Sequence, residues 1–407
     1  MTNKRDRELR ESKVIRDPIH GDIFLTELEM RIVDSLEFQR LRRIKQLGMT
    51  YLVYPSANHT RFEHSLGAMH VASRVAERLQ LPKDDAIKLR VAALLHDAGH
   101  GPLSHTSEEL LERYMGQSHE EITMELINSS DLSAILRDEG LKPEEVSGLI
   151  LGRGGRLGRL ISSELDVDRM DFLVRDAHHT GVAYGIIDLD RLINTLIMHD
   201  DSVAITEGGL RAVEAMLVAR FLMTPTVYLH HTSRIADAMF LRMMERAIDD
   251  GLIEYYKLYT MDDYDAMNLF RGAKGYAGEI STRLNTRRLF KRAHTGEWHE
   301  VKEEMRTKLL SLRENPARRK AIEAEMAANL DLDEGYVVFD IPPVPSPKEL
   351  HTKVVKDGRG CDIWDLSPIV RMLEEAQKSQ WSYAVYAPKE HLEEVARECR
   401  SVESYLG

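Results

Sequence analysis

Several features that define other classes of protein are scarce in this chain. Only two of its 407 residues are cysteine, Cys361 and Cys399, which argues against a disulfide framework and against a cysteine-based zinc site. Phe, Trp and Tyr together make up 6%, too few to suggest stacking platforms for single-stranded nucleic acid. The formal net charge is −12, so neither nucleic acid nor an anionic membrane is an expected partner.

Long apolar runs are missing as well. Nowhere do roughly 18 uncharged apolar residues follow one another, and the segment from Met1 to Lys13 is charged throughout. The sequence therefore predicts neither a membrane span nor a targeting segment, and we expect a cytoplasmic protein. A chain of 407 residues can bury a large core and can form more than one domain.

The stretch from Val91 to His105 joins an apolar helix to a group of potential ligands. Apolar residues before His96 predict a buried helix that brings His96 and Asp97 to its inner end. The glycines and the proline that follow end this helix and leave His100 and His105 on a turn beside the same place. Imidazole nitrogens and carboxylate oxygens bind divalent cations, but buried histidines are more often hydrogen-bonded structure than ligands.

Two flanking segments supply further candidate ligands. A helix that begins at Arg61 would place His64 in its first turn, where the side chain faces the body of the protein. A second helix is expected from Arg159 to Asp176, and Asp168 lies on its apolar face. An acid in that position needs a partner such as a metal ion or an arginine.

The sequence as a whole predicts a mainly α-helical fold. Residues 14–25 form an expected β-hairpin, helical spacing follows over 28–47, and helical character continues to about residue 329. Short β-like runs divided by prolines then predict a small α/β C-terminal lobe. We therefore expect a catalytic core over 1–240, a helical extension over 241–330 and the lobe over 331–407.

Four residues now make a candidate metal site, namely His64, His96, Asp97 and Asp168. Two imidazoles and two carboxylates suit a hard or borderline divalent cation with open positions, rather than a closed structural zinc site. Fe, Mn, Zn, Ni and Mg all fit this donor set. Such an ion polarises a phosphoryl oxygen and acidifies bound water, which is the chemistry of a hydrolase.

Six motifs extend this pattern along the chain. They are Asp17-Pro-Ile-His-Gly, Phe38-Gln-Arg-Leu-Arg42, Ile44-Lys-Gln-Leu-Gly48, Arg61-Phe-Glu-His-Ser-Leu-Gly67, His96-Asp-Ala-Gly-His-Gly-Pro-Leu-Ser-His105 and Asp166-Val-Asp-Arg-Met-Asp-Phe-Leu-Val-Arg-Asp176. Their order resembles the HD superfamily of metal-dependent phosphohydrolases, and in particular its deoxynucleoside triphosphate triphosphohydrolase branch, which includes the mammalian SAM-and-HD-domain protein. The similarity is dense from Val14 to Phe240 and looser beyond.

The resemblance implies an HD-domain helical core with one divalent metal per subunit, and possibly Mg bound to nucleotide phosphates. It implies that the metal ligands are His64, His96, Asp97 and Asp168. It further implies an acid/base group beside the α-phosphate, made of His100, Glu108 and His119, with His105 close to the same phosphate. Glu108 stands where the family has Asp, which keeps the carboxylate on a longer side chain.

The resemblance also implies a dNTP as substrate. The positions that would bind it are Gln46, Leu47 and Asp176 at the 3′-hydroxyl, Arg61, Arg169 and Arg220 at the phosphates, and Phe172 and Tyr228 near the sugar. Arg169 stands where the family has Lys, so the charge is kept. Phe172 stands where the family has Tyr, so one hydroxyl near the sugar is missing.

Regulation by a guanine nucleotide between subunits is a further implication, together with a homotetrameric assembly. The corresponding positions are Lys13, Val14, Asp34, Gln39, Arg42 and Arg191. A basic pair expected shortly before Arg220 is replaced by the residues 207–209, Glu-Gly-Gly. The short segment before Val14 predicts that no SAM domain precedes the core.

The predicted reaction converts a dNTP and water to a deoxynucleoside and triphosphate. Two alternatives remain at this stage. The same site could hydrolyse another nucleotide or phosphate ester, or the protein could be a non-catalytic scaffold that senses nucleotides or binds RNA.

Overall fold

The computed structural model describes residues 12–200, 202–344 and 352–406. The charged leader over 1–11 lies outside the described residues. Contacts group the chain into two compact units. The first unit contains the described residues within Met1–Met223, Tyr255–Asp265 and Glu349–Val370, and the second contains those within Thr224–Glu254, Ala266–Lys348 and Arg371–Gly407. Both consist mainly of helices with small sheets, which confirms the predicted fold class.

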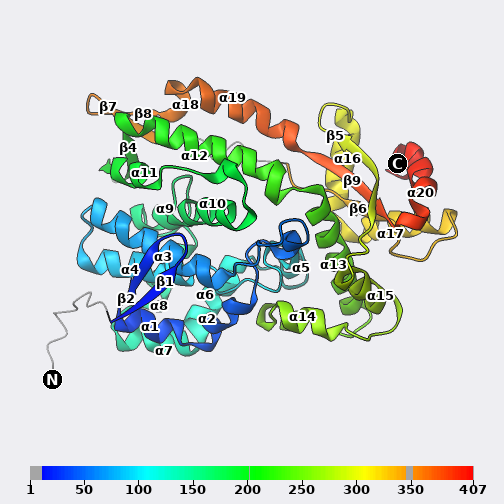
Figure 1. Cartoon of the computed structure of the whole chain (residues 1–407), viewed down its shortest axis with the longest axis horizontal. Helices are drawn as coiled ribbons and strands as arrows, with labels where there is room; N and C mark the ends of the chain where they lie inside the picture. The colour runs from blue at the N-terminus through cyan, green and yellow to red at the C-terminus, as the bar shows by residue number, and fades with distance from the viewer. Residues whose placement is uncertain (1–11, 201, 345–351, 407) are drawn as a thin grey trace. The chain divides into compact units, whose positions relative to one another are not determined.

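The first unit is a helical body with two small sheets (Figure 1). Its helices are α1 (Glu27–Val33), α2 (Leu36–Arg40), α3 (Arg61–Arg78), α4 (Lys83–Leu95), α5 (His105–Met115), α6 (His119–Ser129), α7 (Asp131–Asp138), α8 (Pro143–Ile150), α9 (Arg156–Ile161), α10 (Val167–Thr180), α11 (Leu189–Thr195), α12 (Leu210–Met223) and α18 (Ile363–Leu366). Its strands are β1 (Lys13–Asp17), β2 (Gly21–Leu25), β3 (Leu196–His199), β4 (Ser202–Thr206), β7 (Lys353–Lys356) and β8 (Arg359–Asp362). No single helix among the described residues is both long and apolar enough to cross a membrane.

The expected N-terminal hairpin is confirmed. Strands β1 and β2 pair antiparallel, from Lys13 opposite Leu25 to Asp17 opposite Gly21. The Asp17 carboxylate accepts the backbone N–H groups of residues 19 and 20, both at 2.9 Å, and so closes the turn. Gly21 follows with φ +76°, a backbone conformation that residues with a Cβ rarely adopt.

Helix α3 is the centre of the first unit and packs against both α4 and α10 (Figure 1). It begins at a capping box in which Thr60 and Glu63 satisfy each other's backbone N–H groups. Its buried face runs from the first turn to the last, and His64 lies in the first turn with no exposed surface. Helix α4 ends at Leu95, so His96 is its C-terminal cap, as the apolar pattern predicted.

Two long helices expected from the sequence are in fact broken. The residues from Arg159 to Asp176 do not form one helix, because α9 ends at Ile161 and α10 starts only after Asp166, whose side chain caps it by accepting the N–H of Arg169 at 2.7 Å. The stretch 28–47 is divided for the same kind of reason. Ser35 caps α2 and thereby separates it from α1.

A second sheet in the first unit has the strand order β3-β4-β7-β8. The sequence did not predict the hairpin of β3 and β4, because the residues between the helix ending at Asp176 and the one beginning at Ala212 were assigned no element. Strand β7 pairs with β4 in parallel, with Ala204 opposite Lys353. All strands after residue 331 were expected from the sequence to lie in one C-terminal lobe. Strands β7 and β8 instead belong to the first unit.

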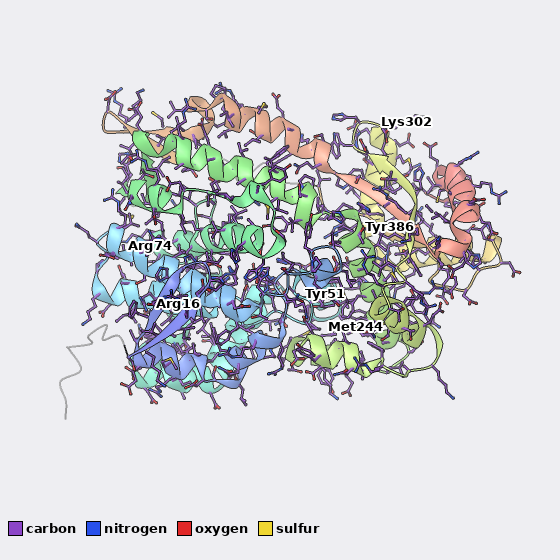
Figure 2. All side chains as sticks on the ribbon, viewed as in Figure 1. Arg16, Tyr51, Arg74, Met244, Lys302 and Tyr386 are labelled. Atoms are coloured by element: carbon purple, nitrogen blue, oxygen red, sulfur yellow. The ribbon has the colours of Figure 1, made fainter. Side chains whose placement is uncertain are left out.

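The second unit packs helices against the sheet β5-β9-β6. Its elements are α13 (His231–Asp249), α15 (Gly275–Asn285), β5 (Lys291–Glu297), α16 (Glu303–Glu314), α17 (Pro316–Asn329), β6 (Val338–Asp340), β9 (Ser382–Ala387), α20 (Leu392–Glu398) and α21 (Val402–Leu406), while α14 (Asp263–Leu269) and α19 (Pro368–Gln377) cross from one unit to the other. Met244 and Tyr386 are buried in this unit, whereas Lys302 is exposed at its surface (Figure 2). Strand β5 corrects the expectation of continuous helix to about residue 329. The three-part domain division stays a prediction.

Candidate active site

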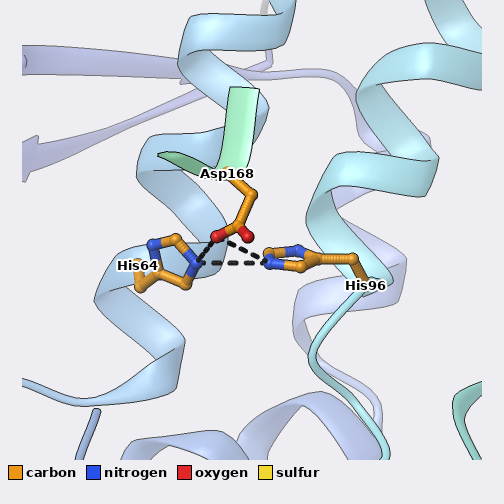
Figure 3. Close-up of side chains that lie close together, drawn as sticks. All are labelled: His64, His96 and Asp168. Carbon is orange, nitrogen blue, oxygen red and sulfur yellow. Dashed lines mark hydrogen bonds and ion pairs between the residues drawn. The ribbon is translucent and has the colours of Figure 1, made fainter. Parts of the chain in front are cut away.

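The four predicted metal ligands come together at the junction of α3, α4 and α10. The Nε2 atoms of His64 and His96 lie 3.2 Å apart, and Asp168 Oδ1 lies 2.9 Å from the first and 3.6 Å from the second (Figure 3). Asp97 completes the group, with Oδ1 3.4 Å from His96 Nε2 and Oδ2 3.6 Å from His64 Nε2. The ligand atoms of His64, His96 and Asp168 all lie within 4.8 Å of one another, whereas Asp97 forms such a group with His100 and His119 and borders the first group from one side.

Hydrogen bonds fix which nitrogen of each imidazole faces that point. His96 Nδ1 donates to the backbone carbonyl of Ala93 at 2.7 Å, and His64 Nδ1 donates to Asp171 at 2.8 Å. Each Nε2 is thereby left for a ligand, which is the tautomer that metal binding requires. The donor set is the one that suits a divalent cation with open positions, so the residues fit the metal expected from the sequence.

The electrostatics of the cluster favour a cation. Burial lowers the pKa of His64, but hydrogen bonds to Asp168 and Asp171 outweigh it and raise the pKa to about 10. Burial raises the pKa of Asp168, yet the two histidines bring it below its usual value. The carboxylates thus hold positive charge at this point, and a divalent cation can replace a proton there.

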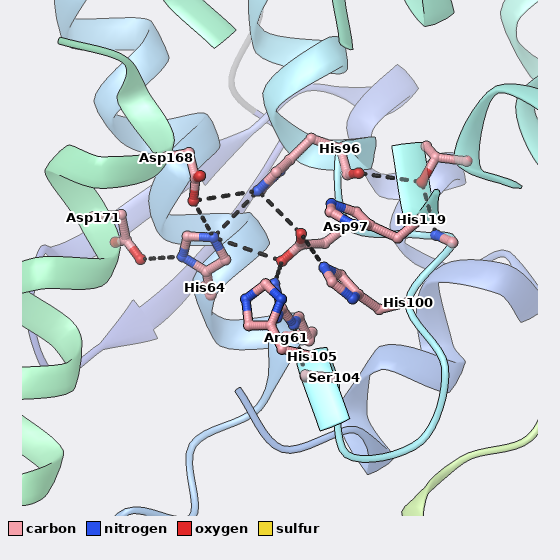
Figure 4. A network of polar contacts seen from close by, with 12 residues as sticks. Arg61, His64, His96, Asp97, His100, Ser104, His105, His119, Asp168 and Asp171 are labelled. Atoms are coloured by element: carbon pink, nitrogen blue, oxygen red, sulfur yellow. Dashed lines mark hydrogen bonds and ion pairs between the residues drawn. The ribbon is translucent and has the colours of Figure 1, made fainter. Parts of the chain in front are cut away.

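Asp97 connects this cluster to a second one (Figure 4). Its Oδ2 accepts from Arg61 Nη1 at 2.7 Å, and its Oδ1 lies 3.3 Å from His100 Nε2. Burial raises the pKa of Asp97, but the Arg61 guanidinium outweighs this effect and holds the pKa well below the usual range. Asp97 is therefore ionised and fixed in place between the two clusters.

The second cluster contains the three residues predicted as the acid/base group, His100, Glu108 and His119, together with His105. The rings of His100 and His119 stack with their centroids 3.9 Å apart, and Glu108 accepts from His105 Nδ1 at 2.9 Å and from His119 Nδ1. His105 is exposed over 68% of its side chain, whereas His100 is buried. One carboxylate thus orients two histidines, and one of these is open to solvent.

Charges in the second cluster are divided between its histidines. Burial lowers the pKa of His119, but Glu108 outweighs it and raises the pKa. Burial and the Arg61 guanidinium both lower the pKa of His100 well below its ordinary value, so this ring is neutral. Burial raises the pKa of Glu108, yet its two histidine partners hold it far below the usual range.

The turn that carries His105 is held by a residue that the sequence did not single out. Leu103 and Ser104 have φ values of 58° and 55°, which are uncommon for residues other than glycine. Asp263 accepts the N–H of Leu103 at 2.6 Å and the N–H of Lys45 at 2.9 Å, which joins this turn to the segment that carries Gln46. Asp263 lies 160 residues away in sequence and belongs to no recognisable motif.

A cavity of about 200 Å³ opens onto both clusters. The predicted residues that line it are Gln46, Arg61, His96, Asp97, His100, His105, His119, Asp168, Arg169 and Phe172. Sequence reasoning missed Glu120, Ile150, Ile161, Ser162 and Asp166 in its wall. Ile150 and Ile161 end short helices and carry no polar group, so their pattern contained no signal of a site.

Other predicted substrate residues lie outside the cavity wall. Asp176 is buried and accepts from His59 Nε2 at 2.8 Å, and Leu47 lies beside Gln46 at the start of a short helical turn. Arg220 is on α12 of the same unit and is not among the residues that line this cavity. Tyr228 belongs to the second unit, so its contact with the sugar stays a prediction.

The predicted regulatory residues form one small group and two separate positions. Gln39 accepts from Arg42 Nε at 3.0 Å and donates to the carbonyl of Val33, the residue before Asp34. The Arg42 guanidinium lies 3.5 Å above the ring of Phe62. Lys13 and Val14 are on β1, and Arg191 is on α11, where it donates to the carbonyl of residue 208.

Comparisons with known proteins identify the family of this chain. The HD domain matches residues 61–176, and the HD associated region matches residues 187–405. The chain is 38% identical over 387 residues to an uncharacterized protein of Methanocaldococcus jannaschii, a match that covers 94% of this chain and 81% of that one. It is 37% identical over 210 residues to human deoxynucleoside triphosphate triphosphohydrolase SAMHD1, covering 42% of this chain and 34% of that protein.

Solved structures show the same fold. A hypothetical protein from Aquifex aeolicus matches with a TM-score of 0.77 at 31% identity, covering 95% of this chain and 99% of that one. A phosphohydrolase from Bacteroides thetaiotaomicron matches with a TM-score of 0.77 at 26% identity, covering 93% and 100%.

The chain belongs to the HD-domain family. It is an HD-domain phosphohydrolase by its family and its structural neighbours, and its His/Asp cluster can hold a divalent metal. The chain spans only about a third of the length of the human SAMHD1 it matches.

Proposed function

We propose that this protein is a metal-dependent dNTP triphosphohydrolase, which converts a dNTP and water to a deoxynucleoside and triphosphate. The observation that carries the proposal is the pair of clusters on one cavity. His64, His96 and Asp168 form a metal cluster, and His105 with Glu108 forms an acid/base pair beside it. Similarity to enzymes named for this activity supports the choice of substrate.

In this proposal His64, His96, Asp97 and Asp168 hold one divalent cation. When bound, the cation supplies Lewis-acid polarisation of the α-phosphoryl oxygen and lowers the pKa of a bound water. The chain's own part is to hold the donor atoms in place before the substrate arrives. Buried hydrogen bonds to both imidazoles perform this role, because they leave each ring with one orientation and one tautomer.

Arg61 binds the substrate phosphates in this proposal. Two of its nitrogens are used inside the site, because Nη1 donates to Asp97 and Nε donates to the hydroxyl of Ser104 at 2.8 Å. Its buried Nη2 has no hydrogen-bond partner among the described residues. A preorganised guanidinium with one unused donor facing a cavity stabilises negative charge on a phosphoryl oxygen without reorganisation.

His105 donates the proton to the leaving 5′-oxygen. Its Nδ1 donates to Glu108, so Nε2 is the nitrogen directed away from the carboxylate, and the side chain is open to the cavity. Glu108 is itself fixed by His119. Neutral His100, whose Nδ1 has no hydrogen-bond partner within the described part of the chain, can bind the same phosphate through that nitrogen as donor or acceptor.

Gln46 is suited to the deoxyribose. Its Oε1 is buried and lacks a hydrogen-bond partner among the residues that the structure describes, so it can accept a hydrogen bond from the 3′-hydroxyl. Phe172 lines the same cavity without the hydroxyl that the family's tyrosine supplies. The proposal extends to activation by a guanine nucleotide at the group of Asp34, Gln39 and Arg42, in a homotetramer.

Chromatographic product analysis tests the reaction. Metal-loaded protein is incubated with each of the four dNTPs, alone and with dGTP or GTP, beside an Asp97→Ala variant as control. Release of triphosphate that requires Asp97 is the expected result, and dependence on added guanine nucleotide would support regulation. Release of inorganic phosphate or pyrophosphate would instead establish a different phosphohydrolase, and ligand binding without turnover would establish a scaffold.

A further inference from the structure

Asp171 is the centre of a buried network one turn along α10 from Asp168. Its Oδ2 accepts from His64 Nδ1 and from Arg175 Nε, both at 2.8 Å. Its Oδ1 accepts from His20 Nε2 at 2.6 Å and from Arg175 Nη2 at 2.9 Å. Four donors from three elements therefore converge on one carboxylate that has no exposed surface (Figure 4 shows its contact with His64).

The N-terminal hairpin reaches this network by two routes. His20, in the turn between β1 and β2, donates directly to Asp171. Arg175 Nη1 donates to Asp17 Oδ2 at 2.8 Å, and the other oxygen of Asp17 accepts the backbone N–H groups of the turn, including that of His20. The turn of the hairpin is thus tied to Asp171 both through a side chain and through Arg175.

Gly67 provides the space that this network occupies. A Cβ at this position of α3 would lie 1.9 Å from Asp171 Oδ1 and 2.3 Å from Arg175 Nη2. Any larger residue would displace the pair from the helix that also carries His64. Only glycine at position 67 therefore leaves room for the Asp171 carboxylate and the Arg175 guanidinium against α3.

The carboxylates of the network outnumber its guanidinium, so negative charge remains for its histidines. Asp17 and Asp171 contribute two carboxylates, and Arg175 contributes one guanidinium, all of them buried. The remaining negative charge faces the protonated nitrogens of two imidazoles, His20 and His64. A carboxylate that accepts from the far nitrogen of a metal-binding histidine makes the near nitrogen a better ligand and fixes its orientation.

We propose that Asp171 is a positioning residue for the metal, that it acts through His64, and that the β1–β2 hairpin supports it through His20 and the Asp17–Arg175 pair. The inference rests on the metal site of the proposed function. It adds that metal affinity depends on the contacts of the β1–β2 hairpin with Asp171 and Arg175. By reciprocity, bound metal stabilises these hairpin contacts by the same free energy.

Metal binding of the whole chain tests the inference without any nucleotide. Wild type, Asp171→Asn and Asp17→Asn are stripped of metal and titrated with Co²⁺ alone, followed by calorimetry and by the visible absorption of bound Co²⁺. Asp171→Asn is expected to weaken binding by about 10- to 100-fold and to change the absorption spectrum. Asp17→Asn, which touches no proposed ligand, is expected to weaken binding by a smaller factor.

Glu323→Gln is the matched control, because Glu323 is also a buried carboxylate paired with an arginine, Arg242, but lies in the second unit. Its Co²⁺ affinity and spectrum should equal those of the wild type. Folded Asp171→Asn protein with wild-type affinity and spectrum would overturn the inference. If Asp171→Asn does not fold, His20→Phe takes its place, and wild-type Co²⁺ binding by both His20→Phe and Asp17→Asn would overturn it.

The readout separates this inference from the proposed reaction. A wild type that binds Co²⁺ and shows the expected losses, but releases no triphosphate from any dNTP, would reject the proposed substrate and leave the role of Asp171 standing. A wild type that binds no Co²⁺ would reject both.

Discussion

Arg61 and Asp97 form a buried ion pair, with Arg61 Nη1 2.7 Å from Asp97 Oδ2 and each side chain at most 3% exposed. The pair spans the space between the metal cluster and His100, and Asp97 is the only one of the four proposed ligands among the described residues that is bonded to an arginine. Arg61 thus holds a proposed metal ligand, and its buried Nη2 has no hydrogen-bond partner among the described residues.

The double use of Arg61 predicts that lysine cannot replace it. Arg61→Lys keeps the charge but loses the fork that reaches Asp97, Ser104 and the phosphate together. We expect kcat/KM for dNTP hydrolysis to fall by about 10²- to 10³-fold. Steady-state kinetics measures this, with Arg74→Lys on the same helix as a control that should be unchanged. A loss of less than about tenfold would contradict the role given to Arg61.

The role of His105 as proton donor predicts a loss that depends on the leaving group. His105→Gln should lower kcat for dNTPs by about 10²- to 10⁴-fold, because the 5′-oxygen then leaves without a proton. With a triphosphate ester of p-nitrophenol, whose leaving group needs no proton, the variant should retain most of the wild-type rate. Glu112→Gln, on the exposed side of α5, serves as control. Equal losses with both substrates would assign His105 to binding instead.

Phe172 predicts weak discrimination against ribonucleotides, and Phe172→Tyr should strengthen it. The added hydroxyl restores the group that the family places near the sugar, and one hydrogen bond is worth up to about tenfold in selectivity. The measurement is the ratio of kcat/KM for dATP to that for ATP in wild type and variant. An unchanged ratio would show that residue 172 does not face the sugar.

Asp263 predicts a pH-dependent stability. Burial raises its pKa to about 6 from an ordinary 3.8, although the N–H groups of Leu103 and Lys45 lower it in part. The folded state therefore binds the proton more tightly than the unfolded state, so this contribution is present below pH 3.8 and is lost as the pH rises through about 6.

Urea unfolding of wild type and Asp263→Asn at about pH 4 and about pH 7 measures the effect. Relative to the variant, whose amide cannot ionise, the wild type should lose up to about 3 kcal/mol of unfolding free energy between the two pH values. A difference between the two proteins that does not change with pH would contradict the shifted pKa.

The proposed metal ligands could be identified from the sequence because helix signals next to them in the chain determine where they lie. His96 and Asp97 follow an apolar helix that must be buried, and His64 follows a capping signal, so both could be placed without knowing the fold. Asp168 was also identified, although the helix that carries it starts later than expected. The cap at Asp166 explains the error, because a helix signal and an apolar pattern continue across it.

The supporting residues could not be found in this way. Asp171 was visible as an acid among apolar residues, but its partner His20, and Asp17, which is the partner of Arg175, lie about 150 residues away, and only the fold brings them together. Asp263 acts through two backbone N–H groups, which leave no trace in the side chains around it. Strand β5 was missed because charged residues such as Lys291 and Arg292 alternate poorly with apolar ones.

Helix α10 sets how much length variation this protein can tolerate. Asp168, Asp171 and Arg175 are three, then four, residues apart, so one helical face serves the metal cluster and the hairpin in consecutive turns. A residue inserted between Asp168 and Asp171 would rotate Asp171 and Arg175 by about 100° relative to Asp168, so one face could no longer serve both the metal cluster and the hairpin. Insertions in the glycine-rich loop over 152–155 would leave that face untouched, so length differences among relatives should accumulate there and be absent from α10.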